Sequence, residues 1–558
     1  MRYWRLRASL LLLLAVFLPW VEGCSCFIVT SGASQTETLQ VTYAADSHTL
    51  YGYLQFFPRS NHSSGDKIKV TDWDSGEYRG VIDQVPLTYN VIGNVNEYGL
   101  CITESTWGGL EELASQPDAI LDYGSLIYIA LQRATSARQA LKIMTDLVTE
   151  YGYASEGESF TVADPDEVWI LEMIGKGGYE KGAVWAAQRI PNGYISAHAN
   201  QARICSLFPE GNEDEILYSD DAIAFARHIG RFPSDAPDEA FSFSDVYNPL
   251  TFETARGCEG RVWDFFHRAT AADASIMGPY LDYALGFNLT NRMPLYIKPL
   301  APLRTSDILE AMRSHYEDTP LSFNTDVGAE AFGLPYRWRP LTWTASDGQT
   351  YFHERAAATQ QTGFNLLAQL RRDMPDPIKA LQLFAVDDTD SSVMTPVYGG
   401  QTRVPPSYGP GDIAVFEPEK AFWVFNMVAN FAYTRYSLIH PDVKQRQKVR
   451  EEKHQELAAS IDNEFVRLWA EDEDKALAMM TNRCVGNAED LVAEWRKFFG
   501  ELFVKFMDGN VKTKEDPRQL LPTVKQPGYC IEWRDRVVQE TGDRFRVPVA
   551  IETMEARG

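Results

Sequence analysis

The chain has 558 residues, of which 45% are hydrophobic and 12% aromatic, enough to bury a sizeable core. Its 77 acidic residues outnumber the 52 basic ones and give a formal charge of −25. This charge repels phosphate backbones and anionic headgroups, and so argues against nucleic-acid and membrane-surface partners.

The first 23 residues predict a secretory signal peptide. Arginines among the first seven residues precede an apolar run over 8–18, and the small residues Val21 and Gly23 stand at −3 and −1 before Cys24. The run is too short to span a bilayer, and no later stretch is long and apolar enough. We therefore expect a secreted or otherwise extracytoplasmic protein (periplasmic, lysosome-like or extracellular, according to its source) with no membrane contact after leader removal.

The mature chain then alternates between strand and helix patterns. Short strands joined by turns are predicted over 27–48, 88–106 and 159–204. Residues 122–152 have helical spacing, and Ser136 with Gln139 predicts a capping box inside this segment. This order favours an α+β fold in which helices cover the faces of mainly antiparallel sheets.

The C-terminal part of the sequence has a different pattern. From about 416 to 509 it is largely helical, and its charged stretch is interpreted as a solvated helix face. After 516 the proline-containing tail is expected to be irregular and to wrap the surface.

Motifs for metal and phosphate chemistry are missing or incomplete. The sequence contains no HExxH, no GxSxG and no P-loop, and its nine histidines lack ligand spacing. "GKGG" over 175–178 is better explained as a hairpin turn. "DDTDSS" over 387–392 offers oxygen ligands but lacks the other features of an EF-hand, so we predict a polar loop. No metal or organic cofactor is predicted.

Cys24 has three possible roles. With seven cysteines in the chain it could be a disulfide partner, although a bridge to Cys26 would be strained. A lipid anchor is disfavoured because Glu22 stands where a small residue is required. As a nucleophile, Cys24 would gain an α-amino group on leader removal, and this amine could take the thiol proton.

The segments "CSCFIVTSGAS", "TYAADSHTLYG", "GNVNEYGL", "ISAHANQARI", "ERAAATQQTGF" and "VDDTDSSVMTPVYGG" follow one another between residue 24 and about 410. In this order they resemble the dipeptidase A / secernin family of N-terminal-nucleophile cysteine hydrolases. The resemblance implies a four-layer αββα sandwich over 24–414, followed by a helical C-terminal extension over 415–558. It also implies dipeptide hydrolysis with broad side-chain tolerance, whereas more distant relatives cleave other amides.

Site residues are transferred from the family position by position. Cys24 matches the nucleophile, and Cys26 would replace it only if the leader were cut two residues later. Asp46 matches a carboxylate beside the nucleophile, with a turn residue at a strand end as the alternative. Tyr43 stands where many members have an arginine, which leaves the local charge balance open.

Two further polar residues and an arginine complete the set. Asn200 matches an amide that donates to the oxyanion, and the alternative is an ordinary turn asparagine. Thr106 lies where distant relatives have a second asparagine, although a strand-end threonine explains it better. Arg355 is our choice for an arginine near the site, with a surface ion pair as the alternative.

The predicted function is that of a secreted cysteine dipeptidase that acts on dipeptides or other small amides. An acylase with the same nucleophile and a non-catalytic binding protein are the alternatives. A homo-oligomer is left open.

Overall fold

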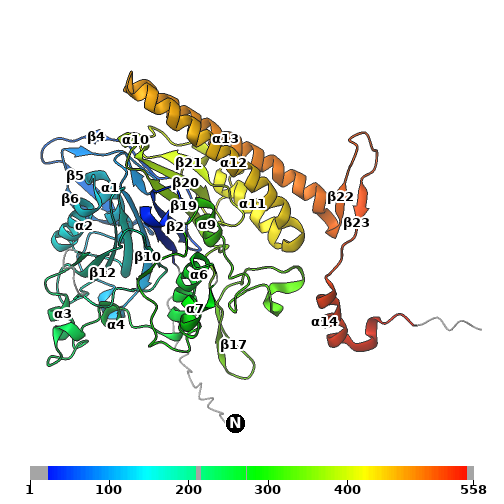
Figure 1. The fold of residues 1–558 in the computed structure, drawn as a ribbon, viewed down its shortest axis with the longest axis horizontal. Coiled ribbons are helices and arrows are strands. Elements are labelled where there is room, and N and C mark those ends of the chain that lie inside the picture. Colours follow the sequence, from blue (N-terminus) through cyan, green and yellow to red (C-terminus); the bar gives the residue numbers. More distant parts are fainter. Residues whose placement is uncertain (1–22, 209–214, 272, 549–558) are drawn as a thin grey trace, which may run out of the picture.

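The computed structural model describes residues 23–208, 215–271 and 273–548. Within these residues the chain forms helices, two large antiparallel sheets and several small ribbons (Figure 1), so the predicted α+β class is confirmed. Of the predicted leader, only Gly23 is among the described residues. None of the described helices combines the length and apolarity needed to span a lipid bilayer.

A seven-stranded antiparallel sheet in the described part of the chain carries the N-terminal strand in its interior. Its strands are, in spatial order, β16 (Tyr296–Ile297), β14 (Ile195–His198), β1 (Cys26–Val29), β2 (Leu39–Asp46), β19 (Thr362–Leu370), β20 (Ala380–Val386) and β21 (Thr395–Tyr398). The pairing of Ile28 with Val41 joins β1 to β2 and confirms the hairpin predicted over 27–48.

An eight-stranded sheet, again counted over the described residues, faces the first. Its strands are, in spatial order, β15 (Ile216–Tyr218), β13 (Ala183–Arg189), β12 (Val168–Gly175), β11 (Gly157–Ala163), β10 (Cys101–Gly108), β9 (Val95–Asn96), β8 (Val91–Ile92) and β3 (Phe56–Phe57). The pairing of Gly175 with Ala183 places "GKGG" at the turn between β12 and β13, as predicted. The ribbons are β4–β7 (Ser60–Asn61, Leu87–Thr88), β5–β6 (Lys67–Thr71, Tyr78–Asp83), β17–β18 (Thr342–Thr344, Thr350–Phe352) and β22–β23 (Val511–Thr513, Thr523–Lys525).

Apolar cores lie between the sheets and on their outer faces. Ile28 points into the core between the sheets, whereas its neighbour Phe27 points to the outer face and stacks on Phe265 with ring centroids 4.4 Å apart. Burying one such side chain contributes ~2–3 kcal/mol. The outer face of the seven-stranded sheet is covered by α6 (Gly260–Ala269) and α9 (Thr305–Met312). The outer face of the eight-stranded sheet is covered by α1 (Tyr123–Arg133) and α2 (Ala137–Tyr151). Shorter helices are α3 (Ala222–His228), α4 (Phe243–Tyr247), α5 (Phe252–Thr254), α7 (Ala274–Met277), α8 (Leu281–Ala284) and α10 (Asp376–Lys379).

The N-terminus of α2 shows a cap that differs from the predicted box. The Ser136 hydroxyl accepts from the backbone N–H of Gln139 at 3.3 Å, as expected. The Gln139 side chain, however, accepts from the backbone N–H of Thr135 at 2.8 Å and from its hydroxyl at 3.1 Å. The predicted reciprocal bond to Ser136 is therefore wrong, because Thr135 offers two donors where Ser136 would offer one.

Three long helices follow the sheets: α11 (Ala421–Tyr433), α12 (Tyr436–Trp469) and α13 (Glu473–Phe506). They confirm the helical prediction for 416–509, and α12 and α13 pack on the β20–β21 side of the seven-stranded sheet (Figure 1). The irregular tail predicted after 516 is wrong in part, because α14 (Ile531–Thr541) forms there and buries none of its residues. The division of the chain at 414/415 stays a prediction.

The loop between β20 and β21 holds three aspartates, and we call residues 387–390 the aspartate loop. It is a polar loop, as predicted, but it is buried beneath α11 and α12. Asp388 accepts hydrogen bonds from Tyr336 at 2.5 Å and from Tyr433 at 2.8 Å. Asp390 pairs with Lys444 at 3.1 Å. The loop therefore ties the C-terminal helices to the sheet.

Candidate active site

The Cys24 thiol is buried between the two sheets, directly before β1. Its Sγ lies 3.1 Å from Oε1 of Glu104 and 3.8 Å from the hydroxyl of Tyr43, and Tyr43 donates to the same Glu104 oxygen. Burial, and then the negative charges of Glu104 and Asp46, raise the pKa of the Cys24 thiol well above its usual value. With residue 23 still attached, the thiol is therefore neutral and donates to Glu104. All seven cysteines lie in the described residues and are free thiols.

Asp46 ends β2 and forms a buried ion pair with Arg355. The guanidinium Nη2 lies 2.7 Å from Asp46 Oδ2, and the Thr362 hydroxyl donates to Oδ1 at 2.7 Å. Burial raises the pKa of Asp46 to about 6, because the loss of hydration outweighs the attraction of Arg355. Arg355 also donates to the carbonyl of Gly23, whose N–H donates to the Asp46 carbonyl at 3.0 Å. Arg355 is thus buried beside Cys24 and is not part of a surface ion pair.

Asn200 follows β14 and has a left-handed backbone, with φ of 63°. Its side-chain oxygen accepts from Arg261 at 2.7 Å and from Arg355 at 3.3 Å, and its amide nitrogen donates to the carbonyl of Thr106. A Cβ built on Gly23 would lie 1.9 Å from that nitrogen. The Asn200 amide therefore lies directly against the residue that precedes Cys24.

Thr106 enters the site through its backbone. Its carbonyl accepts from Asn200, whereas its hydroxyl donates to Glu158 at 2.9 Å. Burial, and then the charge of Glu104, raise the pKa of Glu158 well above its usual value. The Thr106 side chain is thus bonded to Glu158, and its role at the oxyanion stays a prediction.

The structure adds two residues that the sequence reasoning missed, Glu104 and Arg261. Arg261 on α6 donates to the Cys24 carbonyl at 2.9 Å and to the Ser25 hydroxyl at 2.8 Å. A glutamate inside the apolar strand "CITEST" is a signal that could have identified Glu104, because unpaired carboxylates are rarely buried. Arg261 lies in a helix with other charged residues, so its sequence gives no such signal.

The structure therefore brings Cys24, Asp46, Asn200 and Arg355 into one hydrogen-bonded network, which Thr106 joins through its carbonyl. Their catalytic roles stay predictions. Among the described residues no cluster of three or more histidine, cysteine or acidic side chains is arranged to hold a metal.

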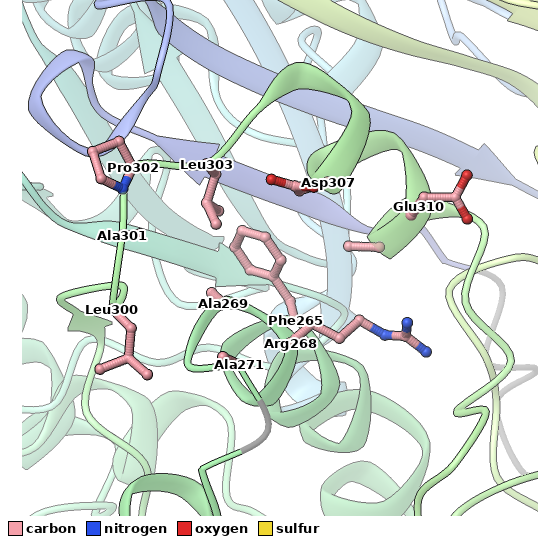
Figure 2. Close-up of a pocket in the computed structure, with 11 residues that line it drawn as sticks. Phe265, Arg268, Ala269, Ala271, Leu300, Ala301, Pro302, Leu303, Asp307 and Glu310 are labelled. Atoms are coloured by element: carbon pink, nitrogen blue, oxygen red, sulfur yellow. The ribbon is translucent and has the colours of Figure 1, made fainter.

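A separate pocket lies on the outer face of the seven-stranded sheet, between α6 and α9 (Figure 2). Phe265 occupies its centre, with Leu303 on one side and the charged groups of Arg268 and Glu310 at its rim. Because Phe265 stacks on the outer-facing Phe27, the sheet separates this pocket from the Cys24 thiol. It is not part of the Cys24 site.

Comparison with known proteins identifies the family. The model of peptidase family C69 matches residues 63–449, so this chain belongs to peptidase family C69. The match includes Thr106, Asn200 and Arg355, while Cys24 and Asp46 precede it. A protein named probable dipeptidase from Latilactobacillus sakei is 24% identical over 293 residues, which are 52% of this chain and 53% of the relative. Dipeptidase A from Lactobacillus helveticus is 23% identical over 336 residues, which are 60% of this chain and 62% of the relative. The matches thus span between half and two thirds of these relatives, and the predicted resemblance to dipeptidase A is confirmed.

Proposed function

We propose that the protein is a secreted dipeptidase whose nucleophile is the thiol of an N-terminal Cys24. The observation that carries the proposal is the contact between Arg355 and the Gly23 carbonyl, one residue before the thiol. A carbonyl at this position lies beside the nucleophile and is polarised by a buried guanidinium. Membership of peptidase family C69 and the names of the two relatives support peptide hydrolysis.

In the proposed reaction, removal of residues 1–23 frees the α-amine of Cys24. This amine, directly or through a water, takes the thiol proton, and Sγ attacks the scissile carbonyl carbon. Collapse of the tetrahedral intermediate passes the proton to the leaving amine and leaves a thioester. A water activated by the same amine then hydrolyses the thioester, which releases the acid and restores the thiol.

Asn200 and Arg355 are the proposed oxyanion donors. Both lie against residue 23, whose position the acyl part of a substrate would take once the leader has left. A preorganised donor of this kind contributes on the order of 3–4 kcal/mol to transition-state stabilisation. Asp46 holds Arg355 in place, and Arg261 holds the amide of Asn200.

The proposal extends to the fold. The two facing sheets with helices on both outer faces fit the αββα sandwich of N-terminal-nucleophile hydrolases. The leader pattern before Cys24 supports export. No organic cofactor or metal has a part in this scheme.

The test combines the mass of the mature N-terminus with turnover of a dipeptide panel. We expect a free Cys24, and a loss of at least about 10³-fold in turnover for Cys24→Ala. Cys26→Ala is the matched control and should keep activity within about threefold. A different N-terminus, or full activity in Cys24→Ala, would refute the mechanism. Faster turnover of N-acyl amides than of dipeptides would instead identify an acylase.

A further inference from the structure

Arg339 lies in the same pocket as Arg355, and residues of the segments 335–341 and 354–360 line this pocket. Arg337, Arg339 and Glu354 line this pocket together with Arg355. The pocket is thus continuous with a residue of the proposed active site.

The charges in the pocket do not balance. Glu354 is paired with Arg256, and Arg337 is paired with Asp326 at 2.9 Å, so these two charges are compensated. Arg339 has no carboxylate within 4.0 Å among the described residues. Its one hydrogen bond there runs from Nε to Oε1 of Gln361 at 2.8 Å. Arg339 therefore has no ion-pair partner of its own among the described residues, although the Asp46 carboxylate lies near enough to attract it.

One polar group that contacts Arg339 is a donor that lacks an acceptor. Among the described residues, Nε2 of Gln361 is buried without a hydrogen-bond partner, and Arg337, which lines the same pocket, has two such nitrogens, Nε and Nη1. Leaving such a buried donor unsatisfied costs ~1–3 kcal/mol. A carboxylate bound to Arg339 would also offer an acceptor to Gln361, because it only accepts hydrogen bonds and has two oxygens.

The surroundings of Arg339 also favour an anion. Burial, and then the nearby cation Arg355, lower the pKa of Arg339 to about 9; the Asp46 carboxylate opposes this shift, and Arg261 adds a smaller lowering effect. The side chain remains cationic at neutral pH, although it is repelled by the two neighbouring arginines. An anionic ligand would relieve this repulsion.

We propose that Arg339 binds the free α-carboxylate of the substrate and so restricts the enzyme to dipeptides. The inference rests on the proposed function. In a dipeptide, one amide nitrogen and one Cα separate the scissile carbonyl from the terminal carboxylate. A receptor for that carboxylate must therefore neighbour the group that holds the scissile carbonyl, as Arg339 neighbours Arg355. A tripeptide or a dipeptide amide presents no negative charge at this place.

The experiment compares Ala-Ala with Ala-Ala amide as substrates of the mature protein. Arg339→Gln should lower kcat/KM for Ala-Ala roughly 10- to 100-fold, mainly through KM, and change that of the amide less than about threefold. Arg339→Lys should recover part of the loss. Arg372→Gln is the matched control, because Arg372 is exposed, pairs with Asp166 and does not line the pocket. An equal loss on both substrates would overturn the proposal.

Calorimetry on the Cys24→Ala protein separates this inference from the proposed function. We expect Ala-Ala to bind more tightly than its amide, and Arg339→Gln to remove the difference. If the parent hydrolyses no dipeptide but this preference is found, the proposed function fails and the carboxylate site stands. If the Cys24→Ala protein binds both ligands equally, the carboxylate site is refuted whatever the turnover.

Discussion

Two buried charged regions lie at the same end of the seven-stranded sheet, and they differ in how their charges are compensated. β2 and β20 both run antiparallel to β19, so the C-terminal ends of β2 and β20 lie at the same end of the sheet. Asp46 is the last residue of β2, and the aspartate loop follows β20. Among the described residues, the guanidiniums of Arg261, Arg339 and Arg355 all lie near the Asp46 carboxylate, and Arg355 forms an ion pair with it. In the aspartate loop each carboxylate has donors from other parts of the chain.

The difference separates the aspartate loop, which holds helices in place, from the region of the proposed active site. Tyr436 donates to Asp390 at 2.5 Å and Asn426 donates to Asp387 at 2.8 Å, so the loop uses its acceptors to hold α11 and α12. Beside Arg339, Nε2 of Gln361 is a buried donor without an acceptor among the described residues, which is unfavourable in the free protein. That cost is explained if a substrate supplies the missing acceptor.

The largest effect is expected from removing the charge of Asp46. Asp46→Asn leaves Arg355 without its counter-ion, and kcat/KM should fall about 10³-fold, equal to about 4 kcal/mol. Since the pKa of Asp46 is raised to about 6, the ionised form that holds Arg355 exists above that pH. Parent activity should therefore fall as the pH drops through about 6. A pH–rate profile checks this, and the same acidic limb in Asp46→Asn would contradict the assignment.

The aspartate loop should respond in the opposite way. Asp388→Ala leaves the hydroxyls of Tyr336 and Tyr433 without their acceptor, so the free energy of unfolding should fall by ~3 kcal/mol. The kcat/KM of the folded protein should stay within about threefold of the parent value. Urea unfolding and dipeptide turnover measure the two quantities. The control is Asp373→Ala in an exposed turn, for which we expect a change below about 0.5 kcal/mol. A selective loss of activity in Asp388→Ala would remove the distinction between the regions.

Asp387 gives an effect on stability that depends on pH. Burial raises its pKa from 3.8 to about 8, so between these values the folded chain keeps a proton that the unfolded chain has lost. This stabilisation is complete below the lower value, falls by about 1.4 kcal/mol per pH unit, and is lost above about 8. Asp387→Asn keeps a neutral side chain at every pH. The stability difference between parent and variant should therefore fall from pH 5 to 8 in urea titrations, and parallel curves would contradict it.

The smallest effect should come from outside both regions. Ser136→Ala removes the cap of α2 and should cost about 1 kcal/mol of stability, with turnover unchanged. Thermal unfolding and dipeptide turnover check it. Ser136→Asp, which keeps an acceptor, should restore the stability, and its failure to do so would show that the cap is not the cause.

Local patterns predicted much of this fold. The β1–β2 hairpin, α1, α2 and the long C-terminal helices each have a periodicity that a single segment contains. α14 was missed because "CIEWRDRVVQET" follows a proline and a glycine, and the helix buries none of its residues, so it shows no apolar face. Burial of the aspartate loop could not be predicted, since its donors come from distant segments.

The resemblance to the family predicted which residues form the site but not their contacts. It gave Cys24, Asp46, Asn200 and Arg355, which the structure joins in one hydrogen-bonded network. Glu104 reaches the thiol only because the two sheets face each other, and the local sequence does not contain that packing. For the same reason Thr106 could be placed near the site while the direction of its hydroxyl could not.

The contacts of α12 with the sheet region follow a stripe along one side of this helix. Hydrogen-bonding or ion-pairing groups at His440, Lys444, Gln447, Glu451, His454, Ala458 and Asp462 recur every three or four residues. An apolar stripe would tolerate sliding along the helix axis, whereas directional bonds over about 33 Å fit only one alignment. These bonds thus fix the position of α12 along its own axis relative to the sheet. Inserting one residue near its start would turn the later groups by about 100° and take them out of reach of their partners.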